Sequence, residues 1–202
     1  MITLYDYELS GSCYKVRLFL NILGLEYRIH PIDFVQREHK SDEFLAINPF
    51  GELPVLDDGG IFLRDAQSIL VYLARKYDRS GRWYPDDAIS MGLIAQWLAV
   101  GGGELMSISA ARLVKALNYG LDIDKHHEIA NRALRIMDRH LSTRLFLELG
   151  RPTIADIACF PYSALANEAG LDLAPYPNVV DWIQRMRKID RFTPMPGILP
   201  VT

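Results

Sequence analysis

Apolar and polar positions along the chain divide it into two parts of different character. In residues 1–77, short β-prone runs alternate with stretches whose apolar residues recur at helical spacing, in the order β-α-β-α-β-β-α. The turn Asp57-Asp58-Gly59-Gly60 between the last two runs indicates a hairpin. The pattern predicts a mixed four-stranded sheet with strands at 2–7, 26–32, 53–56 and 61–63 and helices at 13–23, 41–47 and 65–77.

The periodic segments of the second part are all helical. Residues 78–88 combine charged residues with Gly and Pro, which is typical of a linker. Gly101-Gly102-Gly103 either kinks the first of the following helices or breaks it in two. Thr153 and Asp156 have the spacing of a capping box. The helices are expected at 91–117, 125–147, 153–169 and 179–186. We therefore predict an α+β protein with a domain in residues 1–78, a linker in 79–85 and an all-α domain in 86–202.

Composition and charge narrow the possible functions. The 202 residues carry 22 Lys and Arg against 25 Asp and Glu, and this formal net charge of −3 disfavours nucleic-acid binding, which needs clustered positive charge. Two cysteines, Cys13 and Cys159, are too few for a disulfide framework or a Cys-rich zinc site, and the histidines lack metal-ligand spacing, so we expect no metal. No secretory signal begins the chain, and no apolar run approaches the roughly 18 residues of a membrane span. We expect a cytoplasmic protein that makes no membrane contact.

The first candidate for chemistry is the turn between the first strand and the first helix, where Ser10 precedes Cys13 by three positions. A helix N-terminus stabilises thiolates and other anions because its N–H groups are unpaired. A redox thioredoxin-like domain would carry Cys-x-x-Cys here, but Ser10 cannot form a disulfide with Cys13. This pattern favours a reactive sulfur supplied by a ligand. Plain capping of the helix by Ser10 or Ser12 is the alternative.

The second candidate is the stretch Asn48-Pro49-Phe50-Gly51-Glu52-Leu53-Pro54-Val55-Leu56. A proline just before a strand removes a hydrogen-bond donor from the sheet. The backbone of Leu53 could then bind an extended peptide ligand. An ordinary Pro-Gly turn that leads into a core strand is the alternative.

Four motifs, in this order, resemble those of the glutathione transferase family. They are the strand–Ser–helix start at Ser10, the Glu38-His39-Lys40 segment, the stretch 48–56 and the helix that opens at Asp65. The Thr153 capping box in the helical second part extends the resemblance to nearly the whole chain. The sequence looks most like soluble bacterial members and the phi and theta-like branches. The resemblance implies a thioredoxin-like first domain and an all-α second domain.

The resemblance also implies how the glutathione thiolate is managed. Ser10 matches the serine whose hydroxyl stabilises the thiolate, which would lower the pKa of the thiol. Gly11-Ser12-Cys13 resembles instead the beta class, in which the cysteine is the functional residue. We favour Ser10, because Lys15-Val16-Arg17 fits the serine branches better, with Cys13 and then Ser12 as alternatives.

The remaining glutathione-binding residues also follow from the resemblance. His39 and Lys40 match residues that hold the glycine carboxylate, and Leu53 would pair through its backbone beside a cis Leu53–Pro54 bond. Asp65 stands where the family usually has Glu or Gln, and Ala66 stands where it usually has Ser. Glu52 replaces the more usual Gln or basic residue. These departures predict weaker glutathione binding, which Gln67 could compensate. The full predicted set is His39, Lys40, Glu52, Leu53, Pro54, Asp65, Ala66 and Gln67.

The resemblance places the second substrate between the domains, beside Tyr7, Leu9, Glu104 and Arg112. The implied activity is a transferase that conjugates the thiolate of glutathione, its co-substrate, to small hydrophobic electrophiles. A homodimer is implied as well. Two alternatives are a glutathione-dependent disulfide reductase that uses Cys13 and a non-catalytic transferase-like binding or scaffold protein.

Overall fold

The computed structural model of the chain describes residues 1–198. A four-stranded sheet has the order β2-β1-β3-β4 and is built from β1 (Ile2–Asp6), β2 (Tyr27–Pro31), β3 (Val55–Asp58) and β4 (Ile61–Arg64). Strand β1 runs parallel to β2 and antiparallel to β3, and β3 and β4 form the expected hairpin. The prediction of a small mixed sheet is confirmed.

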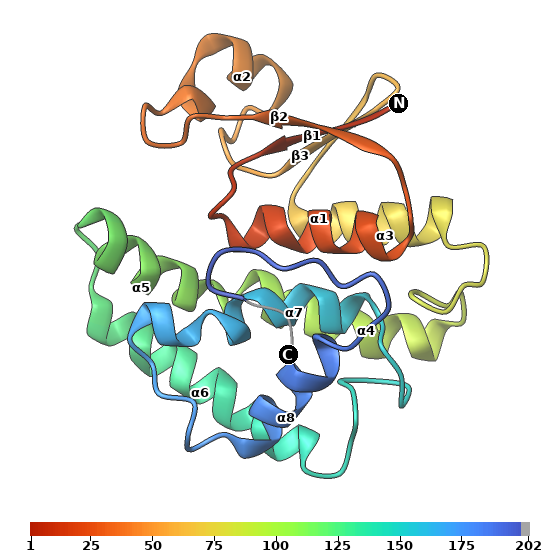
Figure 1. The fold of residues 1–202 in the computed structure, drawn as a ribbon, viewed down its shortest axis with the longest axis vertical. Helices are drawn as coiled ribbons and strands as arrows, with labels where there is room; N and C mark the ends of the chain where they lie inside the picture. Colours follow the sequence, from red (N-terminus) through yellow and green to blue (C-terminus); the bar gives the residue numbers. More distant parts are fainter. Residues whose placement is uncertain (199–202) are drawn as a thin grey trace.

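Helices cover both faces of this sheet. The helices α1 (Gly11–Ile22) and α3 (Ala66–Tyr77) lie between the sheet and the rest of the molecule, whereas α2 (Asp42–Ile47) lies beyond the sheet, next to the short 3-10 helix η1 (Glu38–Lys40) (Figure 1). Helix α1 begins two residues earlier than the apolar pattern predicts, because Ser10 caps it. This capping places Ser10 at the edge of the domain interface.

The second part of the chain is helical, as predicted. Its elements are α4 (Ala88–Gly102), α5 (Met106–Leu117), α6 (Ile123–Leu141), α7 (Ile154–Ala164), the 3-10 helix η2 (Ala166–Ala169) and α8 (Pro177–Met186). The three consecutive glycines break the first predicted helix in two, since α4 ends at Gly102. Residues 78–87 connect α3 to α4, and the division into residues 1–78 and 86–202 stays a prediction.

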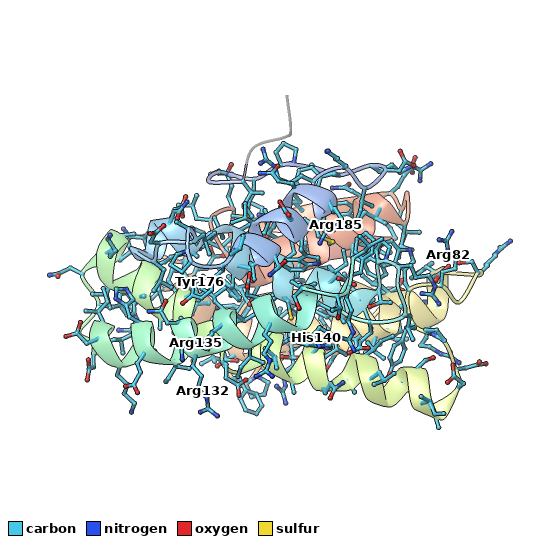
Figure 2. The ribbon with its side chains drawn as sticks, turned by 90° about the horizontal axis from the view of Figure 1, so that it is seen from below. Arg82, Arg132, Arg135, His140, Tyr176 and Arg185 are labelled. Carbon is cyan, nitrogen blue, oxygen red and sulfur yellow. The ribbon has the colours of Figure 1, made fainter. Side chains whose placement is uncertain are left out.

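Helix α6 is amphipathic and shorter than predicted. Its apolar side, which includes Leu134 and Met137, is buried, while Arg132 and Arg135 extend outward (Figure 2). The helix ends at Leu141, and the buried backbone N–H of Leu147 donates to Asp156 Oδ1 at 2.9 Å instead of continuing the helix. The chain therefore turns back toward the start of α7.

Helix α7 is the centre of the fold. The predicted capping box is present, with Asp156 Oδ2 accepting from the Thr153 N–H at 2.9 Å, and Asp156 Oδ1 also accepts from Trp182 Nε1 at 2.9 Å. Every residue from Ile154 to Ser163 is buried, and one face of the helix packs against α1 while another packs against α4. One apolar core therefore joins both parts of the chain.

The stretch Ala88–Leu117 is long and apolar enough to cross a membrane by composition alone, with 28% of its most apolar window buried. A break after Gly102 divides it into α4 and α5, which pack against α7 and α6. Core helices of water-soluble proteins meet the same criterion, so this stretch is weak support for a membrane span.

Candidate active site

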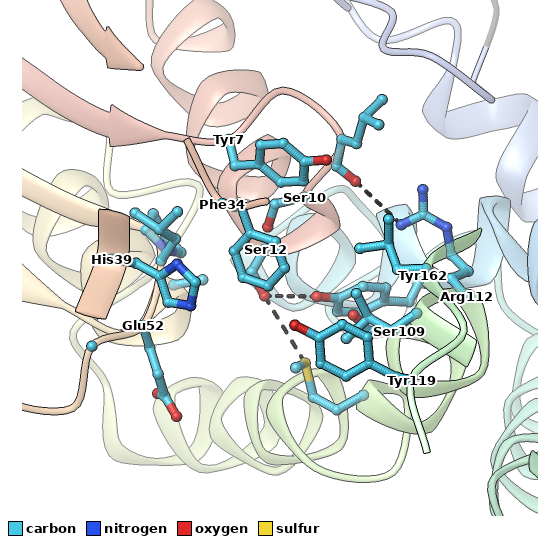
Figure 3. Close-up of a pocket in the computed structure, with 18 of the residues that line it drawn as sticks. Tyr7, Ser10, Ser12, Phe34, His39, Glu52, Ser109, Arg112, Tyr119 and Tyr162 are labelled. Atoms are coloured by element: carbon cyan, nitrogen blue, oxygen red, sulfur yellow. Dashed lines mark hydrogen bonds between the residues drawn. The ribbon is translucent and has the colours of Figure 1, made fainter. Parts of the chain in front are cut away.

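A cleft of about 980 Å³ opens between the sheet domain and the helical domain (Figure 3). One wall comes from the β1–α1 turn, η1, the segment before β3 and the start of α3, and the other comes from α5 and α7. The cleft brings together thirteen of the predicted residues: Tyr7, Leu9, Ser10, Ser12, His39, Lys40, Glu52, Leu53, Pro54, Asp65, Ala66, Gln67 and Arg112.

Ser10 sits where the chain leaves β1 and enters α1. Its Oγ accepts a hydrogen bond from the Cys13 N–H at 3.2 Å, so the O–H remains free to donate into the cleft. The turn is held by Arg17, which forms an ion pair with buried Asp6 at 2.5 Å and donates to the Glu8 carbonyl at 2.7 Å. A rigid turn thus presents one hydroxyl at a helix N-terminus, which is an environment that stabilises an anion.

The other two candidates for managing a thiolate lie in different surroundings. Cys13 is fully buried and does not line the cleft, and burial, followed by the nearby Asp6 carboxylate, raises the pKa of its thiol to about 12. Ser12 lines the cleft, but its Oγ lies 2.7 Å from Tyr162 Oη. Cys13 therefore lacks the access and the low pKa that a reactive thiol needs.

Three stacked rings form the wall beside Ser10. The Tyr7 and Phe34 centroids are 5.2 Å apart, and the Phe34 and His39 centroids are 4.4 Å apart with the rings nearly parallel (Figure 3). Burial, with help from the cations of Lys40 and Arg37, lowers the pKa of His39, so the imidazole is neutral at pH 7. His39 Nδ1 is buried without a hydrogen-bond partner in the described chain.

Lys40 supplies the positive charge next to this histidine. Its Nζ donates to the carbonyls of Phe50 and Gly51 at 3.1 and 2.7 Å. Asn48 shapes the same segment, since its Nδ2 donates to the Glu52 carbonyl at 2.8 Å. These contacts hold the segment that leads to Leu53, and the Leu53–Pro54 peptide bond is cis, as the resemblance implies.

The start of α3 holds the residues at which the sequence departs from the pattern of the resembled family. Asp65 has a left-handed φ of 71°, and its Oδ1 caps α3 by accepting from the Ser68 N–H at 2.9 Å. Ala66 is buried in the cleft wall and contributes no side-chain donor. Gln67 lines the cleft, and its Oε1 is buried without a partner among residues 1–198. Gln67 Oε1 is therefore an unpartnered acceptor at this end of the cleft.

The predicted second-substrate residues are only partly brought together. Arg112 lines the cleft, but its guanidinium forms an ion pair with Glu168 at 2.7 Å and donates to the Leu9 carbonyl at 3.3 Å. Glu104 lies outside the cleft, because the chain turns outward after α4 ends at Gly102 and leaves Glu104 exposed. Arg112 thus ties the β1–α1 turn to the helical domain.

Several cleft residues were missing from the sequence-based prediction. Tyr162, Ser109, Met106, Tyr119, Phe34 and Glu168 all line the cleft. Tyr162 lies in an apolar stretch that predicts core packing, and it is only 1% exposed. Its hydroxyl, however, lies 2.7 Å from Ser12 Oγ within the cleft (Figure 3). The sequence offered one signal for Tyr162: a tyrosine, whose hydroxyl needs a polar partner, stands in a largely apolar helix of the second domain.

Comparison with family models assigns both parts of the chain. Residues 4–81 match the model described as glutathione S-transferase, N-terminal domain, and residues 110–185 match the model described as glutathione S-transferase, C-terminal domain. The first match contains most of the wall of the cleft that the sheet domain forms, and the second contains Arg112 and Tyr162.

Individual relatives agree with the family models. Maleylacetoacetate isomerase of Rhizobium meliloti (strain 1021) is 32% identical over 94% of this chain and 92% of its own length. Glutathione S-transferase 3 of Zea mays is 31% identical over 77% of this chain and 73% of its own length. The crystal structure of a glutathione S-transferase from Pseudomonas fluorescens Pf-5 is similar with a TM-score of 0.88 at 32% identity, covering 96% of this chain and 98% of that one.

Proposed function

The chain belongs to the glutathione S-transferase family, and we propose that it is an enzyme in which Ser10 stabilises the thiolate of glutathione for attack on a small hydrophobic electrophile. The free O–H of Ser10, at a helix N-terminus in the cleft, is the observation that carries this proposal. A hydrogen bond to the sulfur anion lowers the thiol pKa and makes the nucleophile available near neutral pH. The new carbon–sulfur bond then forms as the leaving group departs from the electrophile.

The rest of the glutathione side fits a peptide with two carboxylates and one ammonium group. His39, as a neutral donor, and Lys40, as a cation, would bind the glycine carboxylate. The unpartnered Oε1 of Gln67 would accept a hydrogen bond from the γ-glutamyl ammonium group. It would compensate for Asp65, whose side chain is shorter than Glu and whose Oδ1 caps α3. Binding of glutathione measured by calorimetry tests this assignment. No heat and no thermal shift at millimolar ligand would instead support a scaffold protein.

Ser10→Ala is the direct test of the catalytic assignment. A hydrogen bond to a charged group contributes roughly 1.5–3 kcal/mol, so the pKa of the bound glutathione thiol should rise by roughly one to two and the rate near neutral pH should fall roughly 10- to 100-fold. Ultraviolet absorbance of the thiolate and conjugation of a chromogenic aryl halide measure the two effects.

Two neighbouring variants complete that test. Ser12→Ala and Cys13→Ala should leave the thiol pKa within about 0.5 of the wild-type value, since neither residue binds the thiolate in this proposal. Collapse of activity in Cys13→Ala would support the disulfide reductase hypothesis. An unchanged thiol pKa in Ser10→Ala would show that the assignment of Ser10 is wrong.

A glutathione-dependent isomerase is the second candidate, and the 32% identity to maleylacetoacetate isomerase over 94% of this chain favours it. The same thiolate can add reversibly to a conjugated double bond, which leaves a single bond that rotates before the thiolate departs. Glutathione is then regenerated, whereas conjugation consumes it. Quantifying glutathione during turnover of a cis-configured conjugated diketo acid distinguishes the two activities.

We also propose a homodimer that uses the outer face of α4. Apart from Ser90 and Gln96 this helix carries no polar side chain, yet most of its residues stay accessible in the single chain. Small residues at Ala88, Gly92, Ala95 and Ala99 repeat along the exposed side, where they would allow a second helix to approach closely.

A cytoplasmic location stays a prediction.

A further inference from the structure

Lys15 is a fully buried lysine on α1, at the junction of the two domains. Its side chain is 0% exposed, and the described chain places no carboxylate within ion-pair distance of it. Lysine is almost never fully buried unless its charge is compensated. Its Nζ instead donates to the Gly101 carbonyl, at 2.8 Å, near the C-terminal end of α4. That end carries unpaired carbonyls and partial negative charge, so it is a favourable site for a cation.

The consecutive glycines of α4 are explained by this junction. A Cβ on Gly101 would lie 2.8 Å from the Ala158 carbonyl oxygen, so only glycine lets α4 approach α7 this closely. A Cβ on Gly102 would lie 1.9 Å from Gln67 Nε2, so this glycine makes room for a cleft residue of the other domain. The end of α4 is therefore shaped to meet Lys15, α7 and the start of α3 together.

Lys15 also supports the opposite wall of the cleft. Its Nζ lies 4.5 Å from the ring centroid of Tyr162, which is a cation–π contact within a desolvated region. The hydroxyl of that ring lies 2.7 Å from Ser12 Oγ, and the ring contacts Gly11, where a Cβ would lie 2.6 Å from it. One buried cation thus touches the α4 terminus and the Tyr162 wall.

We propose that Lys15 is a positioning residue, whose ammonium group holds the end of α4 and the ring of Tyr162 against the glutathione-binding domain and so sets where the second substrate lies relative to the thiolate. This inference rests on the proposed transferase function. Lys15 contacts neither substrate itself. Its effect should reach the electrophile side of the cleft, because Tyr162 and Met106, the first residue after the α4–α5 turn, line that side.

The charge on Lys15 should make this support pH-dependent. Burial lowers the pKa of Lys15 to about 8, and the nearby Cys159 and Asp65 offset part of that decrease. The ionisable groups that face it are Asp65 at the start of α3 and Cys159 and Tyr162 on α7, while α4 offers backbone carbonyls. As the pH rises through about 8, the amine becomes neutral and its attraction for the carbonyl and the ring weakens. Turnover should therefore fall at alkaline pH.

Lys15→Met tests the proposal, because it keeps an unbranched side chain and removes the charge. Misplacement of a reacting group commonly costs up to about 100-fold, so kcat/KM for the electrophile should fall roughly 10- to 100-fold. The Kd of glutathione should stay within about twofold of the wild-type value, and the pKa of its bound thiol within about 0.3. The alkaline decrease in kcat should disappear. Lys125→Met, at an exposed lysine on α6, is the matched control and should equal wild type.

The outcomes separate this inference from the function on which it rests. Wild-type protein that binds no glutathione would overturn the proposed function, and this inference with it. Wild-type conjugation together with a folded Lys15→Met variant of equal rate and equal alkaline profile would overturn the role of Lys15 alone. If the variant does not fold, the wild-type profile decides: a fall in kcat above about pH 8 without a fall in melting temperature supports the role, and a flat profile overturns it.

Discussion

At the scale of single residues, Asp58 joins the sheet to α3. Its Oδ2 accepts hydrogen bonds from Tyr72 at 2.8 Å, Lys76 at 2.6 Å and Tyr77 at 2.5 Å. Partial burial alone would raise the pKa of this carboxyl, but these three donors outweigh burial and bring the pKa to about 2. The ionised form is therefore favoured by folding.

Asp58→Asn is expected to lower the melting temperature at pH 7 and to lose this effect in acid. The folded-state pKa lies below the ordinary value of about 3.9, so the carboxylate stabilises the protein above about pH 4 and its contribution disappears as the pH falls toward 2. Thermal unfolding at several pH values measures the difference. Asp86→Asn, at an exposed carboxylate, should show a much smaller difference at every pH, and an equal loss would contradict the assignment.

Ser10 and Cys13 are the two main candidates for managing the glutathione thiolate, and they lie within one helical turn of each other. Ser10 caps α1 and lines the cleft, whereas Cys13, three positions later, is turned into the core and has a raised pKa. Their order in the sequence identifies both as candidates. Their environments differ because Ser10 is the extended N-cap residue before the first turn, at the end of α1 that meets the cleft, whereas Cys13 lies within that turn and is fully buried, and the sequence alone did not establish this difference.

At the scale of secondary-structure elements, two physical effects predict opposite changes in stability for a substitution at the end of α4. Helix propensity predicts that Gly101→Ala stabilises α4 by up to about 1 kcal/mol. The added methyl would lie 2.8 Å from the Ala158 carbonyl, and overpacking of this kind typically costs about 1–3 kcal/mol. Close packing between α4 and α7 should therefore prevail.

We accordingly expect Gly101→Ala to lower the free energy of unfolding, measured by denaturant titration. The expected signs for propensity and packing are opposite, so the direction of the change identifies which one dominates. Stabilisation would show that α4 can move away from α7 without cost. The same variant should also weaken turnover of the electrophile, because Gly101 is the partner of Lys15.

At the scale of the whole molecule, the two domains form one packing unit. A single apolar cluster contains residues of α1 and α3 as well as residues of α4 and α7. The cleft lies on this junction, so its geometry depends on how the domains pack and not on either domain alone. The cleft should therefore keep its shape only while both domains are folded.

The proposed dimer leads to a prediction at the same scale. Ala95→Arg places a long charged side chain on the exposed small-residue face of α4, and burial of an unpaired charge there should convert the dimer to a monomer at micromolar concentration. Analytical ultracentrifugation measures the change. Ala174→Arg, a matched substitution at an exposed position outside α4, should leave the dimer intact. A monomeric wild-type protein would contradict the proposal.

The sequence by itself determined the fold class, the order of strands and helices, and a set of candidate residues that includes Ser10, His39, Lys40 and Leu53. Local patterns suffice for the fold class and the order of elements, because apolar periodicity, caps and turn residues act over a few positions. The roles expected of His39, Lys40 and Leu53 came instead from the resemblance to a known family. The capping box at Thr153 and the helix that Ser41 caps were predictable for the same reason.

Only the tertiary structure decided which of these candidates meet, and what joins them. Tyr162 reaches Ser12 across 150 positions of sequence, and Lys15 reaches Gly101 across 86. Glu104, which the resemblance implied, and Cys13, which stands at the start of the first helix, both lie outside the cleft. Burial and close approach depend on how distant elements pack, and the shared core around α7 sets both. For that reason the contacts of Lys15, Gly101 and Gly102 at the cleft became visible only in the folded chain.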